Sequence, residues 1–303
     1  MRIQARPGSL AHIRRFGKGD PLGGTTAKPR EIAPGISAAP LEDLIYQGGK
    51  IVPQMEFQNV YLGTNSSWQE SDIVSIDAAI KLAMQHRGLN NVMAQYFHNA
   101  KMTCDARASF VLGDPDPKAL DEPDVQKLVT RLYDESRIAK SDLDAAIFNL
   151  ILPPGAVLKM GSDTSHAGLG GYHGSLHIKR SGKTVTLYYS ANVYSQKLDN
   201  GGENGVVAFD QPWKNVVATL YHELNEFRTD ADVNDAIHKN DNRYIGWSSQ
   251  SGSEVGDQPI AAAASLNEVF KEIAAGKSKT IPVQFLYSNA VHGAEGPIAK
   301  PHT

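Results

Sequence analysis

The sequence predicts an α+β fold, in which a mixed sheet packs on a central helix and on further helices. Two observations support this class. Strand-like and helical stretches follow one another without a regular strand–helix–strand rhythm, and no internal repeat organises them. Hydrophobic residues make up 41% of the 303 residues and charged residues 21%, which is typical of a globular protein with a sizeable core. We therefore expect a single large domain.

The charge balance and the cysteine count exclude several classes of protein. Thirty basic and 33 acidic residues give a formal net charge of −3, so no overall attraction to nucleic acid is expected. Apolar runs such as residues 145–152 are far shorter than the roughly 20 residues that a membrane span needs. The single cysteine, Cys104, excludes an intrachain disulfide and a cysteine-rich zinc module.

The first predicted elements are a strand, a helix and a second short strand. Large apolar side chains recur over residues 55–63 in a strand-like stretch. Ser71 is a suitable N-cap for a helix whose apolar positions recur at helical spacing and which ends near Gly88. Residues 91–97 are expected to form the second strand.

The middle of the chain predicts one more helix and three strands. Asp121 and then Pro123 stand where a helix begins, ahead of apolar residues at helical spacing. The apolar run over residues 145–152 is typical of a buried strand. Alternating residues on both sides of the Ser181-Gly182 turn predict a β-hairpin.

The last third of the chain contains the most strongly predicted helix. Asp210 and Pro212 mark its beginning after the loop at residues 199–205, and its apolar pattern continues to about Arg228. A shorter helix over residues 266–275 and a strand over residues 281–287 complete the predicted elements.

The two ends of the chain are expected to lie outside the folded domain. Residues 1–40 contain many Gly, Pro, Arg and Lys and few large apolar side chains, which predicts a flexible leader. They also lack the apolar stretch of an export signal. We predict that the domain covers residues 41–295, followed by a tail at residues 296–303.

The candidate chemistry lies on the helix that ends near Arg228. Its residues 222–226 read H-E-L-N-E. Positions i and i+4 project from the same face of a helix, so His222 and Glu226 can bind one cation together. Glu223 would then lie beside the ion, where a carboxylate can take the proton of a metal-activated water. This is the arrangement of the zinc-protease motif H-E-x-x-H, with glutamate in place of the second histidine.

A third ligand is needed, and the following segment offers several carboxylates. Asp232 lies ten residues after His222, the spacing of the third ligand in short-motif zinc proteases, but no glycine precedes it to assist the turn. Glu254 and Asp257 lie further along and could each complete the site. The sequence leaves the choice among these three open.

Several short motifs occur in a fixed order over roughly residues 44–290. They are the helix motif at residues 222–226, Thr229-Asp230, Gly246-Trp247, the G-S-E-V-G-D element at residues 252–257, the segments at residues 46–49 and 60–68, Tyr172-His173-Gly174, and residues 283–289. With these motifs the chain resembles the phosphate-induced (EXORDIUM-like) family of plant proteins and its bacterial and fungal relatives.

The resemblance implies a zincin-like metallopeptidase fold for residues 41–295. It also implies that His173 lines the cleft and touches substrate or metal. In a hydrolase, Tyr244, Tyr287 or His173 could stabilise an oxyanion. The resembled family is mostly secreted, but the compartment and the oligomeric state of this chain are left open.

Two functions follow from these residues. The first is a zinc-dependent hydrolase, most simply a peptidase acting on a peptide or protein substrate, with Glu223 as general base, His173 beside it, and a metal held by His222, Glu226, Glu254 and Asp257. The alternative is a non-catalytic extracellular binding or signalling protein with a structural zinc or calcium site. Calcium is a candidate ion because many of the candidate ligands are carboxylates, and calcium is bound by oxygen atoms.

Overall fold

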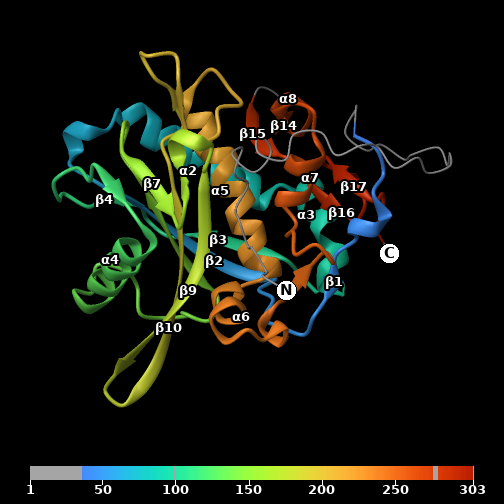
Figure 1. Ribbon diagram of the computed structural model, residues 1–303, viewed down its shortest axis with the longest axis horizontal. Coiled ribbons are helices and arrows are strands. Elements are labelled where there is room, and N and C mark those ends of the chain that lie inside the picture. Colours follow the sequence, from blue (N-terminus) through green and yellow to red (C-terminus); the bar gives the residue numbers. More distant parts are fainter. Residues whose placement is uncertain (1–35, 99, 276–278, 303) are drawn as a thin grey trace.

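The computed structural model describes residues 36–98, 100–275 and 279–302, and it has the predicted α+β class (Figure 1). Its centre is a mixed six-stranded sheet with the order β3-β2-β6-β10-β9, in which β4 also pairs with β2. Neighbouring strands are parallel except for β9, which pairs antiparallel with β10 and forms one edge. The strands are β2 (Gln54–Tyr61), β3 (Thr103–Ala106), β4 (Phe110–Val111), β6 (Ala146–Ile151), β9 (Gly171–Arg180) and β10 (Lys183–Asn192).

Helices cover both faces of this sheet. Helices α2 (Glu70–Gln85) and α5 (Pro212–Thr229) pack on one face, and α4 (Glu122–Asp134) packs on the other (Figure 1). Alternate residues of β6 therefore enter different cores: Ile147 packs with α2 and α5, whereas Phe148 packs with α4. Because both faces are covered, every residue of β6 is buried, as its apolar run predicts.

The remaining strands form small sheets around this core, and short helices connect them. The strand pairs are β1 (Ile45–Tyr46) with β13 (Trp247–Ser248), β11 (Gln196–Lys197) with β12 (Glu203–Asn204), β14 (Phe270–Ala274) with β15 (Thr280–Gln284), β16 (Leu286–Ser288) with β17 (Gly293–Glu295), and β7 (Val157–Met160) between β5 (Ala119–Leu120) and β8 (Asp163–Thr164). The short α-helices are α3 (Arg87–Met93), α6 (Val233–Lys239), α7 (Asp257–Ala262) and α8 (Leu266–Val269). The 3-10 helices are η1 (Pro40–Glu42), η2 (Asn65–Ser67), η3 (Ala94–Phe97), η4 (Ser165–Ala167) and η5 (Asn242–Tyr244).

Most predicted elements are confirmed. The hairpin forms with Ser181 and Gly182 at its turn, since Arg180 pairs with Lys183. Asp121 caps α4 by accepting a hydrogen bond from the backbone N–H of Asp124. The predicted helix start at Ser71 is slightly late, because α2 begins at Glu70.

Two predicted elements are wrong. Residues 91–97 are helical rather than extended, because the buried side chains from Leu89 to Phe97 recur at helical spacing once the segment is followed from the α3 N-terminus. His86 caps that helix by accepting from the N–H of Leu89. The helix predicted over residues 266–275 stops at Val269, where the chain enters β14 and pairs with β15. The tertiary strand pairing outweighs the local helical pattern there.

Helix α5 is buried along nearly all of its length. Its residues from Asn215 to Thr229 are buried on every side, between the sheet, α2 and β15. Pro212 occupies its first turn, as predicted, although the N-cap is Gln211 rather than Asp210. Polar side chains on such a helix must find partners inside the protein, because burying them unpaired is costly.

The predicted division into leader, domain and tail stays a prediction. Residues 1–35 of the leader lie outside the described residues, whereas Ile36 is buried in a small apolar cluster with Val206 and Ala218. In the tail, the N–H of Ile298 donates to the carbonyl of Gly88. Over the described ranges, no helix combines the length and apolar character that crossing a membrane requires.

Candidate metal centre

Helix α5 places its three candidate residues inside the protein rather than on a solvent face. His222, Glu223 and Glu226 are 2%, 1% and 0% exposed. The Nε2 atom of His222 lies 3.1 Å from Oε1 of Glu226, one helical turn away, and 3.9 Å from Oε1 of Glu223. The prediction that His222 and Glu226 project from the same face of the helix is therefore confirmed.

Strand β9 brings a second histidine to the same place. His173, 4% exposed, has its Nδ1 atom 3.5 Å from Oε2 of Glu223 and 3.6 Å from Oε2 of Glu226. Its Nε2 atom lies 3.7 Å from Oε1 of Glu254. His173 thus contacts the carboxylates of α5 from the edge of the sheet.

The segment before α7 covers the other side of the cluster. It contributes Glu254, which is 2% exposed, and α7 begins with Asp257, whose Oδ1 atom lies 4.0 Å from Nε2 of His222. Between them, the N–H of Gly256 donates to Oε1 of Glu226 at 3.2 Å. A Cβ atom at Gly256 would lie 2.4 Å from Nδ1 of His222, so only glycine permits this approach.

Both imidazole rings are oriented by carbonyl oxygens behind them. The Nδ1–H group of His222 donates to Oε1 of Gln284 at 2.9 Å, and the amide of Gln284 donates to the carbonyl of Gly256 at 2.5 Å. The Nε2–H group of His173 donates to the carbonyl of Asp230 at 3.0 Å. Such bonds fix the tautomer of metal-binding histidines. They direct His222 Nε2 and His173 Nδ1 toward the carboxylates.

Within the described part of the chain, four buried atoms of this cluster have no hydrogen-bond partner. They are His173 Nδ1, Glu223 Oε2, Glu226 Oε2 and Glu254 Oε1. Two compact sets of side chains there can hold a metal ion, His222 with Glu223 and Glu226, and His173 with Glu226 and Glu254. Imidazole nitrogen and carboxylate oxygen are ordinary zinc ligands. The residues present therefore fit a metal ion. We call these six residues the His/Glu cluster: His173, His222, Glu223, Glu226, Glu254 and Asp257.

The titration of the cluster reflects an excess of acidic groups. Burial lowers the pKa of both histidines, but the neighbouring carboxylates outweigh it and raise the pKa of His222 to about 10 and that of His173 well above its usual range. Burial alone would raise the pKa of Glu226, but the two imidazoles have the larger effect and lower this pKa to about 2. For the other three carboxyl groups burial prevails, and their pKa values are raised. A cation would relieve this excess of negative charge.

The other candidate residues from the sequence make their contacts outside the two compact sets. The carboxylate of Asp232 accepts a hydrogen bond from the hydroxyl of Tyr188, and this residue is in neither compact set. Tyr287 donates its hydroxyl proton to the carbonyl of Ala39. Tyr244 lies on η5 with the ammonium group of Lys239 over its ring. Gln284, which positions His222, was not singled out as a site residue, because nothing local marks a glutamine as the partner of a histidine 62 positions away.

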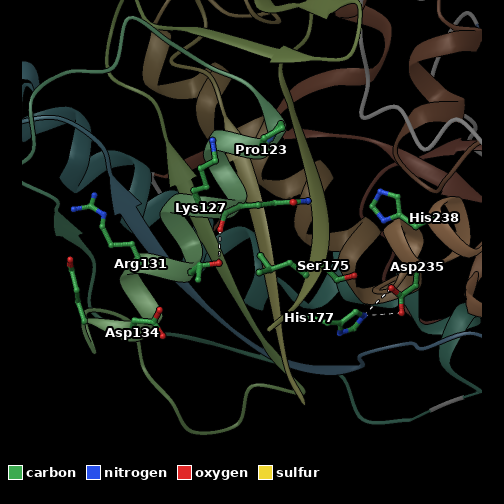
Figure 2. Close-up of a pocket in the computed structure, with 12 residues that line it drawn as sticks. Pro123, Lys127, Arg131, Asp134, Ser175, His177, Asp235 and His238 are labelled. Carbon is green, nitrogen blue, oxygen red and sulfur yellow. Dashed lines mark hydrogen bonds and ion pairs between the residues drawn. The ribbon is translucent and has the colours of Figure 1, made fainter. Parts of the chain in front are cut away.

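A pocket of about 780 Å³ opens beside the same strand. Figure 2 shows its walls: Lys127 and Arg131 come from α4, and Asp235 and His238 from α6. Between them, Ser175 and His177 of β9 line the pocket, two and four residues from His173. The Nε2 atom of His177 lies 2.9 Å from both carboxylate oxygens of Asp235.

No protein-family model, curated protein or solved structure matches the chain. The site is accordingly defined by its own geometry, as a buried histidine and glutamate group of the H-E-x-x-E type that can bind a metal ion.

Proposed function

We propose that this chain is a metal-dependent hydrolase, most simply a zinc peptidase with a zincin-like arrangement. The observation that carries the proposal is the inward set of unpartnered atoms on His173, Glu223, Glu226 and Glu254, within the part of the chain that the structure describes. Leaving such groups buried without a hydrogen-bond partner is costly, and either of the two compact sets to which they belong could hold a cation. When bound, the ion would supply Lewis acidity and would lower the pKa of a water molecule.

Glu223 is the proposed general base. Its carboxylate lies between the two histidines, with Oε1 on the side of His222 and Oε2 on the side of His173. Burial raises its pKa, which suits a carboxylate that must accept a proton and return it. His222, Glu226, Glu254 and Asp257 are the proposed metal ligands. His173 takes part either as a ligand or as a contact to substrate.

The pocket beside β9 supports a peptide substrate. It is lined by backbone and side chains of Ser175 and His177, close in sequence to His173, and by both basic and acidic side chains. A mixed lining of this kind can bind the polar groups of a peptide together with its charged side chains. None of the six residues of the His/Glu cluster is among the residues that line the pocket, and Ser175 is two positions from His173 along β9.

The test combines metal analysis with hydrolysis of a peptide library. We expect purified protein to contain zinc and to cleave peptides, and we expect Glu223→Gln to retain the metal while losing at least about a hundredfold in rate. Asp232→Asn is the matched control, because its carboxylate lies outside the His/Glu cluster. Zinc-loaded protein that cleaves nothing, or Glu223→Gln protein with unchanged rates, would contradict the proposal.

The alternative, a non-catalytic binding or signalling protein with a structural zinc or calcium, is favoured by one observation. Each residue of the two compact sets is at most 4% exposed. Structural metal sites are closed, whereas catalytic sites keep a position open to substrate. Metal bound without hydrolysis would support this alternative, and preference for Ca²⁺ over Zn²⁺ would identify its ion.

A further inference from the structure

We propose that the His/Glu cluster binds two divalent cations, with the carboxylate of Glu226 bridging them. The inference deepens the proposed metal-dependent function and rests on it for the presence of a metal. It adds that the centre is dinuclear rather than mononuclear.

The first argument is that the two compact sets share one residue. His222 belongs to one set and His173 to the other, whereas Glu226 belongs to both. Its two oxygens face in different directions. Oε1 lies 3.1 Å from Nε2 of His222, and Oε2 lies 3.6 Å from Nδ1 of His173. A carboxylate with one oxygen toward each of two nitrogen ligands has the arrangement of a bridge between two ions.

The second argument is that each position has its own terminal carboxylate. Asp257 lies outside the two compact sets, but unlike Asp232 it contacts a cluster histidine, with Oδ1 at 4.0 Å from Nε2 of His222. Glu254 belongs to the same compact set as His173 and Glu226, and its Oε1 atom lies 3.7 Å from Nε2 of His173, the nitrogen that donates to the carbonyl of Asp230. Each proposed ion would therefore have one imidazole, one terminal carboxylate and one oxygen of Glu226. Zinc accepts three protein ligands of these types and completes its shell with a further group.

The third argument is charge. With both imidazoles neutral and all four carboxyl groups of the His/Glu cluster ionised, as metal binding requires, the cluster carries four negative charges in a site that is largely removed from water. One divalent cation would leave two of these charges uncompensated, and buried uncompensated charge is strongly unfavourable. Two divalent cations balance all four.

Glu223 fits this arrangement without changing its proposed role. Its oxygens lie 3.9 Å from Nε2 of His222 and 3.5 Å from Nδ1 of His173, so its carboxylate spans both positions. Two-metal hydrolytic sites hold their ions about 3.5–4 Å apart, which one carboxylate can span.

The decisive measurement is the number of Zn²⁺ ions bound per chain after equilibrium dialysis, determined by elemental analysis. We expect two ions for the wild type and for the control Asp232→Asn. Glu254→Gln and Asp257→Asn should each retain one ion, because each removes a ligand from only one position. Glu226→Gln, which removes the bridge, should weaken both positions and fall below one ion. Circular dichroism of each variant checks that the fold is retained.

A second readout does not depend on any variant. Wild-type protein loaded with Mn²⁺ should give the electron paramagnetic resonance signal of an exchange-coupled pair. An isolated-ion signal together with one Zn²⁺ per chain would overturn the dinuclear centre and leave the proposed hydrolase standing. Absence of any bound metal would overturn both, so the two failures are distinguishable.

Discussion

Two buried polar regions lie on the same face of the central sheet, and they differ in how far the chain itself supplies hydrogen bonds to their carboxylates. In the first, the carboxylate of Asp77 on α2 accepts hydrogen bonds from Asn59 at 2.8 Å, from the hydroxyl of Tyr61 at 2.7 Å and from Ser109 at 2.5 Å. In the second, the His/Glu cluster, one oxygen of each of three carboxylates accepts no hydrogen bond from any described residue: Oε2 of Glu223, Oε2 of Glu226 and Oε1 of Glu254.

The two regions are parts of one row of side chains across the sheet. Asn59 is paired in register with Asn149, Asn149 with Ser190, and Ser190 with His173. Hydrogen bonds of 2.8 Å join Ser190 to Asn149 and Asn149 to Asn59. The row is thus bonded through three strands and on to Asp77, and the cluster begins where it reaches the edge strand. This fold can satisfy a buried carboxylate with its own donors, whereas the cluster keeps buried atoms without a hydrogen-bond partner among the described residues and could hold a metal ion.

Metal removal is the most severe test of this difference. A chelator should lower the free energy of unfolding by about 4 kcal/mol when the free ion is about a thousandfold above its Kd, because only the folded chain presents the complete site. Thermal unfolding with and without the chelator measures the effect. The melting temperature of Glu226→Gln should change little when the chelator is added. If the chelator also left the melting temperature of the metal-loaded wild type unchanged, the cluster would not depend on a metal for its stability.

Removing the carboxylate of Asp77 should lower the stability of the protein whether or not metal is bound. Asp77→Ala leaves three donors without their charged acceptor, and we expect it to cost about 3 kcal/mol. Urea unfolding should show the same loss in metal-loaded and metal-free protein, since Asp77 belongs to the chain's own network. A loss that appears only in the loaded protein would show that the two regions are not independent.

The residue behind His222 should tune the affinity for metal. Gln284→Leu removes the acceptor that fixes the ring, and second-shell changes of this kind weaken metal binding by about 10- to 100-fold. Competition with a metal indicator measures the Kd for Zn²⁺. Gln95→Leu is the matched control, because the Gln95 amide bonds to Val92 and Ser288 outside the cluster. Equal affinities for the two variants would assign Gln284 a packing role only.

The smallest expected effect is a stabilisation. In metal-free protein, Glu254→Gln replaces a buried carboxyl group by a neutral group of the same shape, and we expect the free energy of unfolding to rise by about 1 kcal/mol. Urea unfolding in the presence of chelator measures it. A clear destabilisation of the metal-free variant would mean that Glu254 already has its partner within the chain.

The sequence predicts the fold class well because the signals that define it are local. The apolar run of β6, the Ser181-Gly182 turn and the first turn of α4 each have enough residues of the right type to determine their structure. By contrast, residues 270–274 join a strand only because β15 lies beside them. Pairings between distant segments of this kind are not visible in a local pattern.

The same distinction applies to the candidate site. His222 and Glu226 are one turn apart on a single helix, so spacing alone predicts their proximity. His173, Glu254 and Gln284 come from three other segments, and their arrival at α5 depends on how the sheet edge and the segment before α7 fold against it. The motif at residues 222–226 could therefore be found from the sequence, whereas the orientation of its ring by Gln284 could not.

The close approach of Gly256 to His222 has a kinetic consequence. The backbone of residues 254–257 lies directly against the imidazole and is tied to it through Glu226 and Gln284. We expect an ion bound beneath this segment to leave when the segment lifts, and such local openings carry their own free-energy cost. Exchange of a bound ion with the solvent should then proceed at the rate of that opening and stop rising with chelator concentration. With a residence time set by the opening of this segment, the protein would keep a bound ion while the concentration of free ion is briefly low.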